Sequence, residues 1–306
     1  MAGKKTAAKS GRGAAASRLA RCGDEICEIG RRIYAKGFAA ANDGNISLRL
    51  DAGRVLCTPT LMSKGFMKPS DLCIVDMEGS QLAGERRRSS EILLHLAILK
   101  ERPDVNGVVH CHPPHATAFA VAREPIPQCV LPEVEIFLGD IPIAAYATPG
   151  TQAFADTVKP FVHRSSAILL ANHGTVSFDA SLERAYWWTE IVDAACRILI
   201  LAKQLGGITR LSAGEIRELL EAKRKWGFTD PRLDDPGCEV CGNDVSRSGW
   251  SAAGVSRRAF AGPGPVDGSE PVPVGRNVEA ADIVAIVRTV TEQVCRQLGL
   301  RPDTTP

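Results

Sequence analysis

Short apolar runs typical of strands alternate with longer runs of helical period along the chain up to about residue 226. Apolar residues from Leu19 to Ile33 recur at helical spacing before Gly37, which predicts a first helix over 17–37. Strands are then predicted at 45–50, 55–58, 72–76, 107–111, 141–145 and 167–171, and helices at 90–100, 114–122, 151–162, 182–205 and 212–226. Such alternation predicts an α/β fold built in layers.

The two ends of the chain have a different composition. Residues 1–16 hold Ala, Gly, Lys and Ser without an apolar period, which predicts a disordered basic tail before a folded domain at 17–229. Residues 230–276 are rich in Pro and Gly and predict a flexible linker. An apolar stripe over 277–299 predicts an isolated amphipathic helix, which needs a partner to cover its apolar face.

Composition and charge narrow the class of protein. Hydrophobic residues make up 44% and charged residues 24% of the 306 residues, as in soluble globular proteins. The net charge of +2 does not favour a nucleic-acid partner, and no apolar run is long enough for a membrane span. Ten cysteines without a repeating framework are typical of reduced thiols, so a cytoplasmic location is expected, with a transit peptide at the Arg- and Ala-rich start as the alternative.

Four side chains at the ends of predicted elements suit a metal ion. His110 and His112 are separated by one residue at the end of a predicted strand, so both imidazoles project from the same face. His173 follows another apolar run, and Glu91 begins a helix. Three histidines and a carboxylate favour zinc, although another divalent ion is an alternative. His95 and His115 are competing ligands. Considered alone, His173 is also explained as an ordinary loop histidine, and Glu91 as a carboxylate that stabilises the start of a helix.

Three turns carry groups suited to phosphate. Backbone N–H groups and hydroxyls in tight turns and at helix starts bind anions, although turn formation and helix capping explain each segment separately. The candidates are Gly44, Asn45, Thr58, Thr60, Ser89 and Ser90.

These motifs together resemble one family. Gly44-Asn45-Ile46-Ser47, Thr58-Pro59-Thr60, Ser89-Ser90-Glu91, His110-Cys111-His112 and Asn172-His173-Gly174 are similar, in content and order, to the class II aldolase and adducin head family. The resemblance covers residues from about 18 to about 210. The number of residues that separates Glu91 from His110 is similar to that in L-fuculose-1-phosphate aldolases. It implies a three-layer α/β/α fold assembled as a homotetramer with active sites at subunit interfaces.

The resemblance also implies a chemistry. His110, His112 and His173 would hold Zn²⁺, Glu91 would be a ligand and the acid/base, and the turn residues would bind phosphate. The implied reaction is cleavage of a ketose 1-phosphate, L-fuculose 1-phosphate or L-rhamnulose 1-phosphate, to dihydroxyacetone phosphate and lactaldehyde. The alternatives are an L-ribulose-5-phosphate 4-epimerase, which generally has Asp where this chain has Glu91, and a non-catalytic adducin-like binding head.

Two positions depart from the aldolase pattern. Leu61 stands where the aldolase usually has glycine, and Leu131 stands where it has a tyrosine that assists protonation from the neighbouring subunit. Glu133 and Glu135 lie close to Leu131 in sequence and are candidate second proton donors.

The C-terminal layout resembles the encapsulation peptides that send enzymes into bacterial microcompartments. Residues 277–299 would then dock their apolar stripe on a shell protein. The alternative is that this helix packs on its own tetramer.

Overall fold

One mixed sheet organises the protein, for which a computed structural model describes residues 3–228, 230, 232 and 249–260. Its strands are β1 (Asn45–Asp51), β2 (Arg54–Cys57), β3 (Cys73–Asp76), β4 (Gln81–Ala83), β5 (Gly107–Cys111), β6 (Ile143–Ala144), β7 (Ala167–Leu170) and β8 (Gly174–Asp179). They lie in the order β4-β3-β2-β1-β5-β8-β7-β6, and the neighbours are antiparallel except for β6 beside β7.

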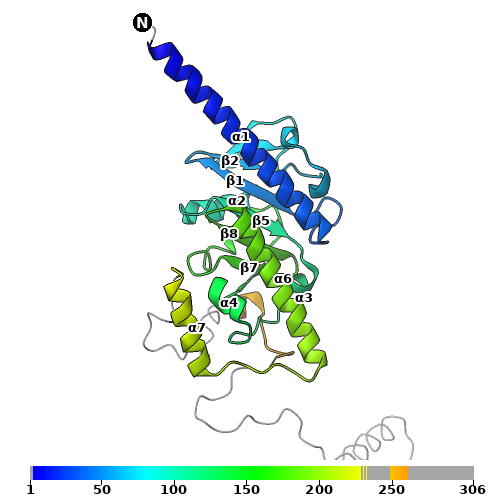
Figure 1. Cartoon of the computed structure of the whole chain (residues 1–306). Helices are drawn as coiled ribbons and strands as arrows, with labels where there is room; N and C mark the ends of the chain where they lie inside the picture. The colour runs from blue at the N-terminus through cyan, green and yellow to red at the C-terminus, as the bar shows by residue number, and fades with distance from the viewer. Residues whose placement is uncertain (1–2, 229, 231, 233–248, 261–306) are drawn as a thin grey trace, which may run out of the picture. The chain divides into compact units, whose positions relative to one another are not determined.

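Helices cover both faces of this sheet (Figure 1). They are α1 (Gly3–Ala35), α2 (Ile92–Glu101), α3 (Pro114–Ala122), α4 (Pro132–Phe137), α5 (Gln152–Asp156), α6 (Leu182–Gln204), α7 (Ala213–Lys225) and α9 (Trp250–Ala253), with short 3₁₀ turns η1 (Lys64–Phe66) and η2 (Pro69–Asp71). Val108 of β5 packs with α2 and α5, whereas the next residue, Val109, packs with α1 and α6.

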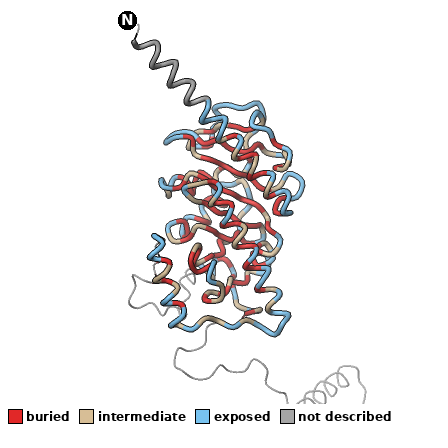
Figure 2. Tube along the Cα trace, in the orientation of Figure 1, coloured by how far each residue is buried: buried red, intermediate tan, exposed pale blue. Residues whose placement is uncertain are grey.

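This alternation places the buried apolar side chains on both sides of the strands. Figure 2 marks the buried residues in red along the Cα trace, and they include most of the central strands β5, β7 and β8. The prediction of a layered α/β fold is confirmed. Within the described residues, no helix is both long and apolar enough to span a bilayer.

Several element boundaries differ from those that the sequence predicts. The strand β8 and the short elements β4 and α4 have no counterpart in the prediction, and α5 ends at Asp156 instead of continuing to residue 162. Residues 157–164 form turns instead, and Val158, Phe161 and Val162 still pack into the core beside α2. Apolar side chains at helical spacing therefore fit a series of turns as well as a continuous helix.

The first helix begins earlier than expected. Residues 3–16, predicted to be a disordered tail, continue α1 towards the N-terminus. Ala, Lys and Arg are strong helix formers, so this composition extends a helix that is anchored by its apolar C-terminal half.

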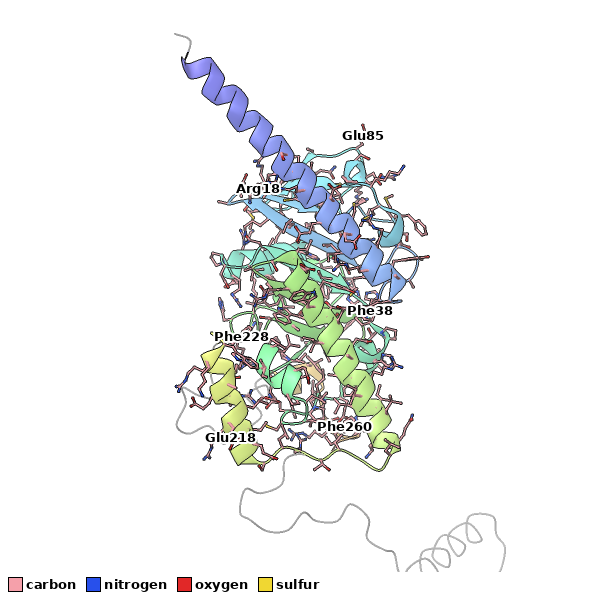
Figure 3. All side chains as sticks on the ribbon, viewed as in Figure 1. Arg18, Phe38, Glu85, Glu218, Phe228 and Phe260 are labelled. Atoms are coloured by element: carbon pink, nitrogen blue, oxygen red, sulfur yellow. The ribbon has the colours of Figure 1, made fainter. Side chains whose placement is uncertain are left out.

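Part of the predicted linker is folded. Residues 249–260 contain α9, and Ala253, Val255 and Phe260 are buried in the same apolar cluster as α3 and α6. Phe260, labelled in Figure 3, stacks on Phe119 with ring centroids 5.8 Å apart. The rest of the predicted linker, apart from residues 230 and 232, and the predicted amphipathic helix at 277–299 lie outside the described residues.

A buried ion network fastens α7 to α4. Arg232 contacts Glu135 at 2.6 Å and Asp230 at 2.9 Å, and Lys223 contacts Asp230 at 2.7 Å. Burial by itself raises the pKa of Asp230, but the hydrogen bonds and charges of Arg232 and Lys223 outweigh it and lower the pKa to about 2. The stabilisation by Asp230 is therefore complete above its unfolded pKa of about 4 and is lost as the pH falls through about 2.

Replacing Arg232 with Met should lower the free energy of unfolding by about 3 kcal/mol, because two carboxylates would stay buried without their guanidinium partner. Urea titration of the full chain at neutral pH measures the change. Arg54→Met, which breaks an exposed pair with Asp51, is the matched control and should leave the midpoint unchanged. An unchanged midpoint for R232M would show that the network does not stabilise the fold.

Candidate active site

Three histidines converge at one end of the central strands. Nε2 of His110 and Nε2 of His112 lie 3.3 Å apart, and the centroid of the His173 ring lies 4.7 Å and 4.9 Å from those of His110 and His112. One nitrogen from each ring lies within 4.8 Å of the other two. The three rings therefore offer a set of ligand atoms that a single ion could bind.

Strand register brings these residues together. Asn45 of β1 pairs directly with His110 of β5, and Cys111 of β5 pairs with Thr175 of β8, which places His173 just before that strand. Gly174 is required for this close approach, because a Cβ there would lie 2.6 Å from both a backbone oxygen and the His112 ring. Gly44 adopts a φ of +73° and would also clash with the His110 carbonyl if it carried a side chain.

Glu91 completes the cluster from the start of α2. Its carboxylate lies 3.3 Å from Nε2 of His110 and 3.4 Å from Nε2 of His173. The amide of Asn45 donates a hydrogen bond of 2.7 Å to it. His95 hydrogen-bonds the oxygen of that amide, and so fixes the orientation of the amide nitrogen towards Glu91. His95 is therefore a supporting residue in the structure and not the competing ligand that its spacing had suggested.

Burial keeps the imidazoles of His110 and His173 neutral. Burial first, and then the neighbouring His112 and His173, lowers the pKa of His110 well below its ordinary value. Burial, followed by His112, lowers the pKa of His173 to about 4. The pKa of Glu91 is raised by burial, against the opposing hydrogen bond from Asn45. Neutral imidazole is the form that binds metal ions.

The donor set fits a divalent cation. Nδ1 of His110 donates to the carbonyl of Thr175 at 2.8 Å, so its Nε2 presents a lone pair towards His112. Nε2 of His112 lies 3.3 Å away, where it donates a hydrogen bond to that lone pair in one neutral tautomer and presents its own lone pair to the same point in the other. Because burial disfavours protonation of His110, its Nε2 is available as a ligand for a divalent cation.

A pocket of about 170 Å³ opens beside the cluster. Most of the predicted phosphate-binding residues line it together with Glu91, His112 and His173: Gly44, Asn45, Thr60, Ser89 and Ser90. Thr58 is different, because it is fully buried and its hydroxyl accepts a hydrogen bond from the backbone of Ile46. Thr58 therefore holds β1 against β2, and the prediction that it contacts phosphate is wrong.

The candidate proton donors near Leu131 lie elsewhere in the chain. Glu135 is fully buried in the ion network with Arg232, so its selection as a proton donor from sequence proximity is wrong. Glu133 is exposed on α4 and does not line the pocket of its own chain. His115, the other competing ligand, pairs with Asp193 at 2.9 Å and stays outside the cluster.

Five residues that line this pocket were not selected by the sequence analysis as site residues: Asn42, Asp43, Pro59, Leu61 and Lys64. Asp43 lies 3.4 Å from Nδ1 of His112, and Lys64 is a buried cation. Leu61 lies on the pocket wall with a φ of +54°, a left-handed conformation that costs a leucine about 1–2 kcal/mol and explains why glycine suits this place. No motif distinguishes Lys64 in sequence, since an isolated lysine in a turn usually indicates an exposed residue.

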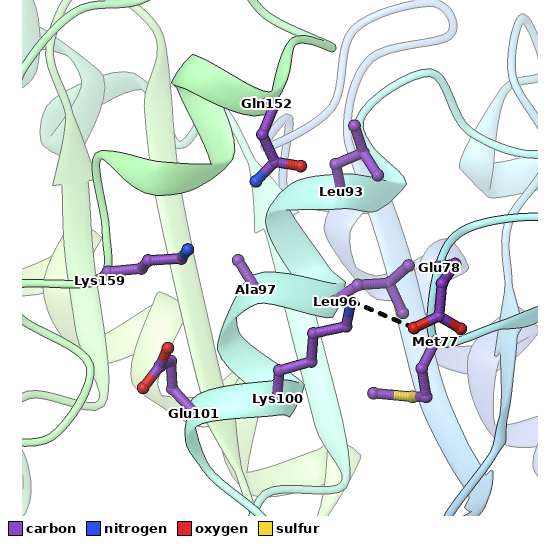
Figure 4. Close-up of a pocket in the computed structure, with 9 residues that line it drawn as sticks. All are labelled: Met77, Glu78, Leu93, Leu96, Ala97, Lys100, Glu101, Gln152 and Lys159. Carbon is purple, nitrogen blue, oxygen red and sulfur yellow. Dashed lines mark ion pairs between the residues drawn. The ribbon is translucent and has the colours of Figure 1, made fainter.

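A larger hollow of about 220 Å³ lies between α2 and α5 (Figure 4). Leu93, Leu96 and Met77 line it together with charged side chains, and Lys100 pairs with Glu78 at 3.6 Å across it. It contains no histidine and no buried acid. The smaller pocket beside the histidines is therefore the better candidate for chemistry.

Fold and site together define a mixed α/β protein with three converging histidines and a largely buried carboxylate. Residues 24–200 match the Class II Aldolase and Adducin N-terminal domain. The chain belongs to this family.

Individual relatives carry different activities. The chain is 31% identical over 211 residues to a 3-oxo-tetronate 4-phosphate decarboxylase of Cupriavidus necator, covering 66% of this chain and 96% of the relative. It is 33% identical over 174 residues to an L-fuculose phosphate aldolase of Methanococcus vannielii, covering 57% and 93%. The crystal structure of YgbL from Escherichia coli aligns with a TM-score of 0.62 at 30% identity, covering 66% and 98%.

Replacing His173 with Ala should reduce the bound divalent metal to less than about a tenth of one ion per chain, because only two imidazoles would remain. Elemental analysis after gel filtration measures the metal content. His163→Ala removes an exposed histidine outside the cluster and should keep the wild-type metal content. Equal metal in wild type and H173A would exclude this cluster as the binding site.

Proposed function

We propose that the protein is a zinc-dependent aldolase that cleaves a ketose 1-phosphate, L-fuculose 1-phosphate or L-rhamnulose 1-phosphate, to dihydroxyacetone phosphate and lactaldehyde. One observation carries the proposal. The Glu91 carboxylate contacts two histidines of the cluster in a pocket that is also lined by Thr60, Ser89 and Ser90. Acid/base, metal-binding and phosphate-binding groups thus share one small cavity.

Glu91 is the proposed acid/base. In aldol cleavage the C3–C4 bond breaks, its electron pair stays with the three-carbon phosphate half, the C4 hydroxyl loses its proton and C3 gains one. Zinc bound by the three histidines would supply the Lewis acid that stabilises the charge on the substrate oxygens. Asn45 holds the carboxylate in place, and in this proposal Glu91 delivers the proton to C3.

Hydroxyl and backbone donors form the proposed phosphate site. The Ser89 hydroxyl accepts a hydrogen bond from the Glu91 backbone N–H, so its own hydrogen remains available for an anion. Ser90 and Thr60 line the same pocket, which lies at the N-terminal end of α2. The positive end of that helix dipole favours a bound phosphate.

Replacing Glu91 with Gln should lower kcat for ketose 1-phosphate cleavage at least about 100-fold, because glutamine retains the shape of the side chain but transfers no proton. Release of dihydroxyacetone phosphate from L-fuculose 1-phosphate and L-rhamnulose 1-phosphate gives the rate. Glu101→Gln, at the opposite end of α2 and outside the pocket, is the matched control and should keep wild-type turnover. Full turnover by E91Q would remove the acid/base assignment.

A second candidate is decarboxylation of 3-oxo-tetronate 4-phosphate, which the similarity to the Cupriavidus necator enzyme supports. Assays for carbon dioxide from that substrate, run beside the aldolase assays, distinguish the two activities. L-ribulose 5-phosphate tests the epimerase alternative in the same series. Dihydroxyacetone phosphate from neither ketose 1-phosphate would reject the aldolase.

We also propose a homotetramer, which the family resemblance supports. Glu133 is exposed and does not line the pocket of its own chain, so in such an assembly it could serve a pocket only from a neighbouring subunit. Analytical ultracentrifugation of the full chain determines the number of subunits. A monomer at micromolar concentration would contradict the assembly.

The final proposal concerns location in a bacterial microcompartment. Its support is the amphipathic pattern of residues 277–299, which lie outside the described residues. A fluorescent reporter fused to residues 270–306 should co-localise with shells in cells that produce them. Diffuse fluorescence in those cells would contradict shell binding.

A further inference from the structure

Lys64 is a buried cation in the wall of the candidate active site. Only 1% of the residue is exposed, and it lines the same pocket as Glu91 and Ser89. Lysine is rarely buried to this extent unless it is paired. Its presence in the pocket therefore needs a reason beyond packing.

The first helix fixes the position of Lys64. A Cβ on Gly30 of α1 would lie 2.5 Å from the Lys64 carbonyl oxygen, and a Cβ on Gly65 would lie 2.6 Å from the Tyr34 ring. Glycine at both positions allows η1 to pack directly on α1. The Lys64 backbone is consequently held between α1 and the pocket.

The ammonium group joins the two turns that flank the pocket. Nζ donates to the carbonyl of Asn42 at 2.8 Å and to the carbonyl of Met62. The first carbonyl precedes the turn with Gly44, and the second follows the turn with Thr60. Lys64 therefore sets the distance between two turns that contribute to the proposed phosphate site.

Among the described residues, no carboxylate lies within ion-pair distance of the Lys64 ammonium, although the charges of Asp43 and Glu91 in the same pocket oppose the lowering of its pKa by burial. An ammonium has three N–H donors, of which two bind the carbonyls. It is also the one Lys or Arg among the residues that line this pocket. Burial lowers the pKa of Lys64 to about 8, so the charged form still predominates at neutral pH.

We propose that Lys64 determines the affinity of the pocket for a phosphate dianion, by supplying its positive charge and by holding the turns at 42–45 and 58–62 together. This inference rests on the proposed function, because it takes the anion to be the phosphate group of the substrate. An ammonium in a buried site, with an N–H donor beyond those that bind the two carbonyls, gains most from an anion that carries two negative charges. Lys64 acts in binding and positioning, whereas Glu91 acts in proton transfer.

Isothermal titration of the zinc-loaded full chain with inorganic phosphate tests the inference. Lys64→Met should weaken phosphate binding at least about tenfold, because it removes a charged hydrogen-bond donor, while Lys64→Arg should stay within about threefold of wild type. With the sugar phosphate, K64M should raise KM by a similar factor and change kcat less than about threefold. Lys68→Met, on the exposed surface of the same segment, should match wild type.

The outcomes separate the inference from the proposed function. Phosphate affinity of K64M equal to wild type would overturn the role of Lys64, and K64R as weak as K64M would overturn the contribution of its charge. Failure of the wild-type protein to bind phosphate would instead reject the phosphate site on which the proposed function depends. If K64M does not show the native circular dichroism spectrum, Lys64→Gln replaces it in the same titration.

Discussion

The antiparallel pairing of β1 with β5 places Asn45 opposite His110, and the geometry of the site depends on this register. From that position the Asn45 amide reaches Glu91, while His95 holds the other end of the same amide. A slip of β1 by one residue would turn Asn45 to the face covered by α1 and α6, away from His110. The two glycines beside the histidines, Gly44 and Gly174, allow the turns to approach closely enough for this arrangement.

Desolvation gives the cluster its chemical character. The fold buries His110 completely and keeps it neutral, which prepares the ring as a ligand. Nε2 of His112 lies 3.3 Å from Nε2 of His110, and Glu91 supplies negative charge on the same side. The same burial leaves Lys64 as a positive charge near the turns, so cation-binding and anion-binding groups lie in one pocket without forming an ion pair with each other.

The sequence predicted the layered fold and the convergence of Glu91 with the three histidines, because strand ends and helix starts follow from local apolar periods. It did not predict the role of Thr58 or Glu135, since the partners of these residues, Ile46 and Arg232, depend on tertiary contacts. The helical start of the chain was missed because a lack of apolar period does not oppose helix formation by Ala and Lys. Lys64 was missed because its burial is imposed by α1 through Gly30.

The central claim is that His110, His112 and His173 hold the catalytic metal beside Glu91. Anomalous diffraction at the zinc edge from crystals of the zinc-loaded protein tests it most directly. We expect one strong peak about 2.0–2.1 Å from a ring nitrogen of each of the three histidines. A strong peak at other side chains, with none among these three rings, would contradict it.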